Sequence, residues 1–184
     1  WVLARYKTKM SSFIFLLYAA ATLIPFQCVM LPLIRFMDGL NLMNRPGLVF
    51  MYLGFGSSLS IILLHGFIKN VPVELEEAAR IDGAGEARIF FTIVLRLLAP
   101  AMVTIFLFLF VGTWNNFLLP LMMVSSDTLK PVTLGLYGMV SLATFNDRGS
   151  LMMGALLGVL PVIVLFLGLQ RYWQAGLAAG AVKG

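Results

Sequence analysis

The chain places a tryptophan and two amides near the middle of its longest uncharged stretch. Trp114 is followed directly by Asn115 and Asn116, and no Asp, Glu, Lys or Arg lies between residues 97 and 126. An indole can stack on a sugar ring while amides hydrogen-bond its hydroxyls, and polar groups in apolar helices are functional candidates by default. Gln27 is a further candidate for such a pathway. Asparagines also hold packed apolar helices together, and we favour that second interpretation for Asn115 and Asn116.

Residues that support catalysis or metal binding are sparse. The chain has a single cysteine, Cys28, a single histidine, His65, and no G-x-x-x-x-G-K-[ST] phosphate loop. The four long uncharged stretches contain no paired carboxylates, so neither acid–base nor metal chemistry is supported. We therefore expect no metal, nucleotide or other cofactor on this chain, and we interpret His65 as a packed or interfacial side chain.

Charged residues gather in one segment, residues 69–96, which holds nine of the 21 charges. At about 3 kcal/mol per charge, burying them in a bilayer would cost on the order of 25 kcal/mol. The segment therefore lies outside any hydrocarbon layer.

The layout of this segment predicts a helix, a turn and a second helix. Pro72 suits a first helical position, and the three glutamates that follow lie where the positive end of the helix dipole stabilises their charges. Gly83 ends the first helix, because its backbone can take positive φ, and a second helix begins near Glu86. A short acidic helix on a tight turn suits docking into a partner's groove; a solvated loop between helices is the alternative.

The composition as a whole is that of a membrane protein. Of 184 residues, 60% are hydrophobic and 11% are charged, against about 25% charged in soluble domains. This excludes a water-soluble globular domain and an intrinsically disordered chain. We expect one transmembrane domain over residues 1–184.

A helix needs about 20 mainly apolar residues to cross a bilayer, and four uncharged runs are long enough. They contain 25, 23, 30 and 22 residues, and we place spans at about 11–34, 46–68, 97–124 and 149–170. The stretch 131–146 is short and contains Pro131 and two glycines, so we interpret it as interfacial or re-entrant.

The basic residues predict the orientation of these spans. Four crossings put nine Lys and Arg residues on the side of the termini and the 69–96 loop, and four on the other side. The termini and the loop are therefore expected in the cytoplasm. Because the sequence begins at Trp1, with an apolar start before Arg5, we expect an N-terminal part of the protein beyond it.

The charged loop also carries a resemblance. Glu77-Ala78-Ala79, three residues, Gly83, nine residues and Ile93-x-Leu95 resemble the EAA motif in membrane subunits of binding-protein-dependent ABC importers. The run 72–84 looks most like the maltose-type carbohydrate permeases. The stretch 114–121 and the ending 176–184 agree with the same family, so the resemblance covers essentially the whole chain. One departure is Arg96, where the family has proline; without it, we expect the second loop helix to run straighter into the next span.

The resemblance implies an all-α polytopic membrane bundle with a cytoplasmic coupling loop, in the prokaryotic plasma membrane. Such a permease works with a cytoplasmic ATPase dimer that binds ATP and magnesium, a second, non-identical permease subunit and an extracellular solute-binding protein. By resemblance Glu77, Ala78, Ala79 and Gly83 form the ATPase-docking knob, with Glu74 and Asp82 helping to hold it. The C-terminal tail, 176–184, is interpreted either as a further ATPase contact or as a frayed end.

Several functions remain open at this point. The resemblance favours import of a sugar or oligosaccharide, whereas importers of polyamines and other solutes carry related loops. A non-transporting scaffold or a passive channel would leave the acidic loop without a purpose. An enzyme is the weakest alternative, because the sequence offers no catalytic constellation.

Overall fold

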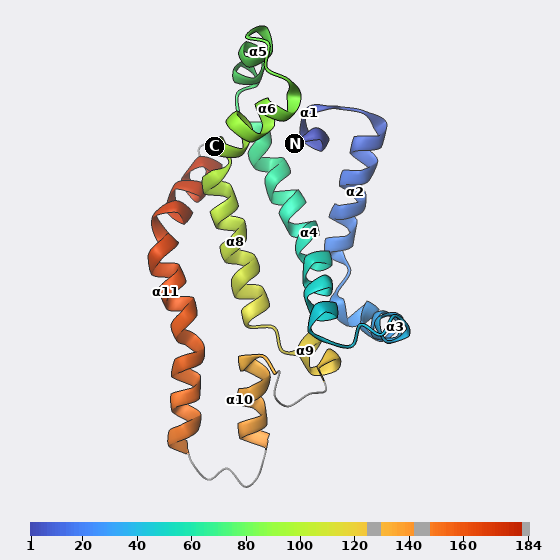
Figure 1. Cartoon of the computed structure of the whole chain (residues 1–184), viewed down its shortest axis with the longest axis vertical. Coiled ribbons are helices and arrows are strands. Elements are labelled where there is room, and N and C mark those ends of the chain that lie inside the picture. Colours follow the sequence, from blue (N-terminus) through green and yellow to red (C-terminus); the bar gives the residue numbers. More distant parts are fainter. Residues whose placement is uncertain (125–129, 142–147, 182–184) are drawn as a thin grey trace. The chain divides into compact units, whose positions relative to one another are not determined.

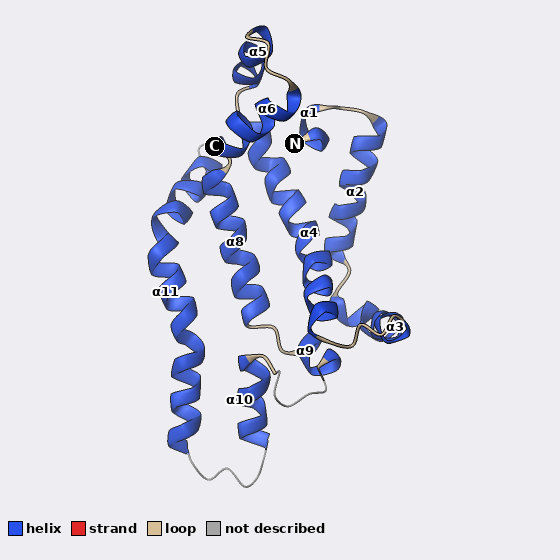
Figure 2. Ribbon diagram, viewed as in Figure 1, coloured by secondary structure: helices blue, strands red, loops and turns tan. Residues whose placement is uncertain are grey.

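The computed structural model describes residues 1–124, 130–141 and 148–181, with Ser141 and residues 172–181 described by their backbone only. Within these ranges every regular element is a helix (Figure 2). In chain order the helices are α1 (Val2–Arg5), α2 (Lys9–Leu23), α3 (Phe26–Gly39), α4 (Arg45–Asn70), α5 (Val73–Ile81), α6 (Glu86–Ile89), the π-helical turn η1 (Phe90–Val94), α7 (Leu95–Leu97), α8 (Ala99–Trp114), α9 (Leu118–Met123), α10 (Val132–Ser141) and α11 (Arg148–Ala181).

The chain folds as two compact units, each built from segments far apart in the sequence. Unit 1 contains Trp1–Leu23, Gly56–Phe106 and Gln170–Gly184, and unit 2 contains Ile24–Phe55 and Leu107–Leu169. Helices α4, α8 and α11 run through both (Figure 1). The charged loop belongs to unit 1, and the stretch with Trp114 belongs to unit 2.

Among the described residues, two helices are long and apolar enough to cross a membrane. They are α4 and the Arg148–Arg171 part of α11, and they coincide with the second and fourth predicted spans. Two bent pairs, α2 with α3 and Glu86–Leu97 with α8, pass the same test if each is counted as one span. Length and composition thus allow up to four crossings.

The first predicted span, 11–34, is not one continuous helix. Helix α2 ends at Leu23, and Pro25 stands in extended backbone before α3. A proline has no N–H for the preceding turn and forces the residue before it out of helical geometry. Pro32, by contrast, lies inside the continuous helix α3.

The third predicted span, 97–124, is also interrupted. Helix α8 ends at Trp114, and α9 begins only at Leu118. The side chain of Asn116 accepts a hydrogen bond from the backbone N–H of Leu119 at 3.2 Å. This bond satisfies one of the free N–H groups at the start of α9, so the break is stabilised by the side-chain amide of a residue predicted for the solute pathway.

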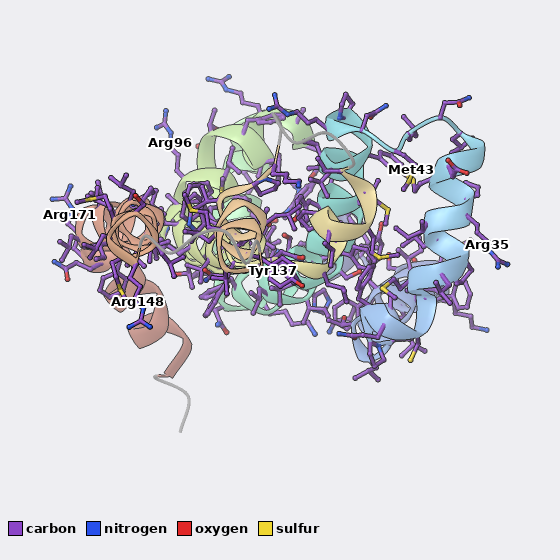
Figure 3. The ribbon with its side chains drawn as sticks, turned by 90° about the horizontal axis from the view of Figure 1, so that it is seen from below. Arg35, Met43, Arg96, Tyr137, Arg148 and Arg171 are labelled. Carbon is purple, nitrogen blue, oxygen red and sulfur yellow. The ribbon has the colours of Figure 1, made fainter. Side chains whose placement is uncertain are left out.

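The expectation of a straighter passage at Arg96 is wrong. The helical segment Glu86–Leu97 meets α8 at a bend of 70° around Leu98. Pro100 stands in the first turn of α8 and has no N–H to donate to the carbonyl of Arg96, four residues earlier, so the helix is broken even without the family proline. Arg96 itself is exposed and extends away from the ribbon (Figure 3).

Unit 1 has an apolar core beneath the charged loop. The buried residues come from α1, the end of α4, α6, η1 and the α7–α8 junction: Ala4, Ile68, Val71, Ile89, Val94 and Leu98. Trp1, Ala79, Ala84 and Phe90 pack against this cluster. Buried aliphatic side chains stabilise a fold by about 1.5–3 kcal/mol each, so this cluster holds the loop's base in place.

Unit 2 has a separate core, formed by Met37, Leu48, Met51, Leu119, Met123 and Val124. Helix α4 begins close to the turn that precedes it, where the side chain of Asn44 accepts the N–H of Gly47 at 3.0 Å. A Cβ on Gly47 would lie 1.8 Å from the carbonyl oxygen of Leu42. Only glycine allows this approach of the turn to the helix.

Candidate functional site

The acidic helix α5 and the short helix α6 lie at one end of unit 1, beyond the end of α4 and beside α1 (Figure 1). Pro72 precedes α5 in extended backbone as its capping residue, so the prediction that it occupies the first helical position is wrong by one residue. Glu74 and Glu76 lie in the first turn, where the positive end of the helix dipole stabilises their charges.

The turn between the two helices is defined by backbone geometry. Gly83 has φ +81°, as predicted for the residue that ends α5. The N–H of Ala84 bonds the carbonyl of Ala79 at 2.9 Å, and the N–H of Gly83 bonds that of Arg80 at 3.0 Å. This pair of bonds is a Schellman motif, and its apolar contact comes from Ala79 and Ala84, which both pack against the unit 1 core.

A bidentate ion pair closes the same turn. The guanidinium of Arg80 donates from Nε to Glu86 Oε1 at 2.5 Å and from a terminal nitrogen to Oε2 at 3.0 Å. The hydrogen bond from Arg80 lowers the pKa of the Glu86 carboxyl, and the same bond raises the pKa of Arg80. The pair links α5 to α6 across Gly83 with fork geometry that a lysine would lack.

Most of the predicted docking residues are exposed on α5 and its turn. They are Glu74, Glu77, Ala78, Asp82 and Gly83. Ile81 adds an apolar side chain that is 87% exposed. Ala79 differs from the others because it is half-buried against the core. The structure therefore brings five of the six predicted residues onto accessible surface and assigns the sixth to the support beneath it.

Glu76 is a further residue of this site, which its place in the sequence does not indicate. Its side chain is 1% exposed and accepts hydrogen bonds from Arg5 Nε at 2.8 Å and Trp1 Nε1 at 3.2 Å. Arg5 also donates to the carbonyl of Val71 at 2.8 Å. These partners are 66 to 75 positions apart in the sequence, and no local pattern joins them.

The pathway candidates of unit 2 are largely engaged in packing. Trp114 donates from Nε1 to the carbonyl of Gly158 in α11 at 2.9 Å and stacks on Phe110. The carbonyl of Asn116 accepts the hydroxyl of Thr133 from α10 at 2.9 Å. Trp114 therefore joins α8 to α11, and Asn116 contacts α10 through its backbone carbonyl rather than its side-chain amide, so the interpretation of both asparagines as helix-joining amides stays a prediction. Asn115 is exposed, and Gln27 is exposed on another helix, α3.

Helix α10 packs on a pair of glycines of α11. A Cβ on Gly154 would lie 3.0 Å from Leu136, and one on Gly158 would lie 3.1 Å from Val132. Small residues spaced four apart allow such close approach between helices. Side chains of the tail 176–181 are not described, and residues 182–184 lie outside the described ranges, so its predicted role has no structural counterpart here.

Comparison with known proteins connects this geometry to a family. The model of the binding-protein-dependent transport system inner membrane component matches residues 1–178. The chain is 38% identical to the probable starch degradation products transport system permease protein AmyC of Thermoanaerobacterium thermosulfurigenes. It is 37% identical to the melibiose/raffinose/stachyose import permease protein MelC of Bacillus subtilis and 34% identical to the arabinooligosaccharides transport system permease protein AraQ of Halalkalibacterium halodurans.

These alignments include 100%, 99% and 100% of this chain and 66%, 66% and 65% of the respective relatives. The chain thus spans just under two thirds of the length of the relatives it matches. The family match and the apolar helices together identify a multi-pass membrane protein of all-α fold. The chain belongs to the family of inner membrane components of binding-protein-dependent transport systems.

Proposed function

We propose that the chain is the larger part of a permease subunit in an ATP-driven importer of a sugar or oligosaccharide, which an extracellular solute-binding protein delivers. The observation that carries the proposal is α5, an acidic helix exposed along most of its length and held on a Schellman turn, in a chain of this family. A scaffold or a passive channel would need no such helix. The relatives AmyC, MelC and AraQ are all named for carbohydrates, which favours a sugar over a polyamine.

The exposed face of α5 is the proposed contact with the ATPase. The exposed side chains of Glu77 and Asp82 offer carboxylates, and Ala78 adds a side chain small enough for close approach. This combination suits a groove with basic residues at its rim. ATP and magnesium bind to the partner ATPase dimer, and this chain supplies no cofactor site. The loop and the chain termini lie on the cytoplasmic side, and a second, non-identical permease subunit completes the pathway.

Movement of α5 has a continuous route toward the membrane. The Gly83 turn leads through α6 and η1 to the bend at Leu98, where α8 begins. π-helical turns inside α-helices occur frequently at functional sites. We assign the exposed Asn115 and Gln27 as candidates for the solute pathway, and Trp114 and Asn116 as residues that hold its helices.

The test is ATP hydrolysis by the complex purified with the full-length permease and reconstituted in nanodiscs with its binding protein. A panel of oligosaccharides and polyamines is added one at a time. Stimulation by one sugar is the expected result. Stimulation by a polyamine alone would overturn the sugar assignment and keep the importer, and failure of any ATPase to co-purify would overturn both.

A further inference from the structure

Helix α5 has a single buried side chain, and that side chain is charged. Glu76 is its only buried residue, at 1% exposure, whereas Val73, Leu75 and Ile81 are 41%, 45% and 87% exposed. Apolar packing therefore does little to fix this helix, and Ala79 contributes only a small half-buried surface. A carboxylate performs the task that aliphatic side chains perform in most surface helices.

The partners of Glu76 come from the segment around α1. Arg5 contacts Oε1 from Nε at 2.8 Å and from a terminal nitrogen at 2.7 Å, while Trp1 donates to Oε2 at 3.2 Å. Arg5 is itself only 11% exposed. Arg80 approaches Oε2 at 3.8 Å from one turn further along α5, and it also forms the bidentate pair with Glu86. These contacts join four side chains into one series of alternating charges, here called the charge ladder: Arg5, Glu76, Arg80 and Glu86.

Burial makes this contact rigid. A buried carboxylate loses its hydration, and removal of its partner leaves a charge that the interior cannot solvate. Rotation or withdrawal of α5 would therefore break the contact with Arg5 at high cost unless the α1 segment moved as well. Arg5 in turn is fixed by its bond to the carbonyl of Val71, at the residue that follows α4.

We infer that Glu76 and Arg5 are positioning residues that make α5 and α1 move as one body, so that force applied to α5 reaches α2 as well as α8. The inference rests on the proposed function, because it concerns how ATPase movement at α5 is passed on. The turn at Gly83 provides the route toward α8. The charge ladder provides a second route through α1, which connects to α2 over a short linker.

The test uses the full-length permease in its complex, reconstituted with its binding protein, and measures ATP hydrolysed per sugar transported. The variants are Glu76→Gln, Arg5→Gln and the double variant. Each single variant is expected to co-purify with the ATPase at the wild-type level and to raise ATP per sugar by about five- to ten-fold, a typical size for a coupling effect. Lys7→Gln, an exposed basic residue near Arg5, is the matched control and should leave the ratio unchanged.

The double variant separates a specific pair from general damage. If the two residues act through each other, the double variant should be no worse than either single one, because no unpaired charge stays buried. It is also the variant expected to accumulate if the single ones do not fold. An unchanged ATP-to-sugar ratio, or effects that multiply in the double variant, would overturn the inference.

A second measurement does not depend on transport. Amide hydrogen exchange over residues 73–81 of the solubilised permease should rise about ten-fold in Glu76→Gln, because α5 loses its anchor. Unchanged exchange would overturn the inference even in an active importer. Failure of wild-type ATP hydrolysis to respond to any sugar would instead contradict the proposed function, and the exchange result would still decide the inference.

Discussion

Residues of one type have opposite roles on α5. Glu77 is exposed, while its neighbour Glu76 is buried against Arg5 and Trp1. Successive helical positions point about 100° apart, so adjacent glutamates face different surroundings. Charge content alone therefore says little about role, and substitutions at the two positions should act differently: one on binding, the other on the support of the helix.

Reversal of the exposed charge should weaken docking without disturbing the fold. In Glu77→Arg we expect about ten-fold weaker association with the ATPase, or roughly 1.4 kcal/mol, because a rim carboxylate becomes a repelling cation. The measurement is titration of purified ATPase onto permease nanodiscs. Arg88→Glu, a reversal on the exposed side of α6, is the control. Equal loss in both variants would argue against a specific docking face.

The Arg80–Glu86 pair predicts how the stability of the Gly83 turn depends on pH. The hydrogen bond from Arg80 holds the pKa of Glu86 below its ordinary 4.5. A carboxyl whose pKa falls on folding stabilises the turn fully above the unfolded value, and this stabilisation is lost as the pH falls through the folded pKa. The turn should therefore be insensitive to pH near neutrality.

Carbon-13 NMR of glutamate-labelled permease in micelles can measure this pKa directly. We expect the Glu86 carboxyl to titrate below 4.5 in the wild type. In Arg80→Gln its pKa should rise toward its ordinary value of 4.5. Arg88→Gln should have no such effect, and a Glu86 titration that is identical in all three proteins would exclude the ion pair in solution.

At the scale of elements, the breaks between helices follow from identifiable residues. Pro25 separates α2 from α3, Pro100 accompanies the bend at Leu98, and the side chain of Asn116 accepts the N–H of Leu119 in the first turn of α9. Proline removes a backbone donor, and an asparagine side chain replaces a backbone acceptor. The first and third uncharged runs are therefore each divided between separate helices.

The start of α4 provides a test of element packing. In Gly47→Ala the new Cβ would lie 1.8 Å from the carbonyl oxygen of Leu42, so either the turn or the helix must shift. We expect a loss of about 1–3 kcal/mol, seen as a lower melting temperature of the detergent-solubilised protein. Gly66→Ala, on the same helix with nothing within 4 Å, is the control and should not destabilise. Equal melting temperatures would show that the turn moves freely away.

At the scale of the whole molecule, the charges divide the chain into sides. Unlike the 69–96 loop, the turn between α3 and α4 (residues 40–44) contains no charged residue, although Arg35 extends outward from α3 before it (Figure 3). The excess of basic residues near the loop and the termini favours their location in the cytoplasm. That orientation is also the one that the proposed contact of α5 with a cytoplasmic ATPase requires.

Cysteine labelling tests this orientation. In a Cys28→Ser background, Leu40→Cys reports on the α3–α4 turn and Ala87→Cys on the charged loop; both positions are exposed. In intact cells a membrane-impermeant maleimide should label Leu40→Cys only, and in inverted vesicles Ala87→Cys only. The reverse pattern would refute the orientation, and labelling of both from one side would refute an odd number of crossings between them.

The membrane class and the turn at Gly83 were predictable from the sequence, because they depend on composition and on neighbouring residues, and the family was predictable from the resemblance of the run 72–84. The positive φ of Gly83 and the helix that follows it are local properties of the segment 73–89. The tertiary structure decided the rest. Arg5 meets Glu76 across 71 positions, and Trp114 meets Gly158 across 44. Such contacts depend on how helices distant in the sequence pack together. A local sequence pattern therefore cannot predict which polar side chain is buried.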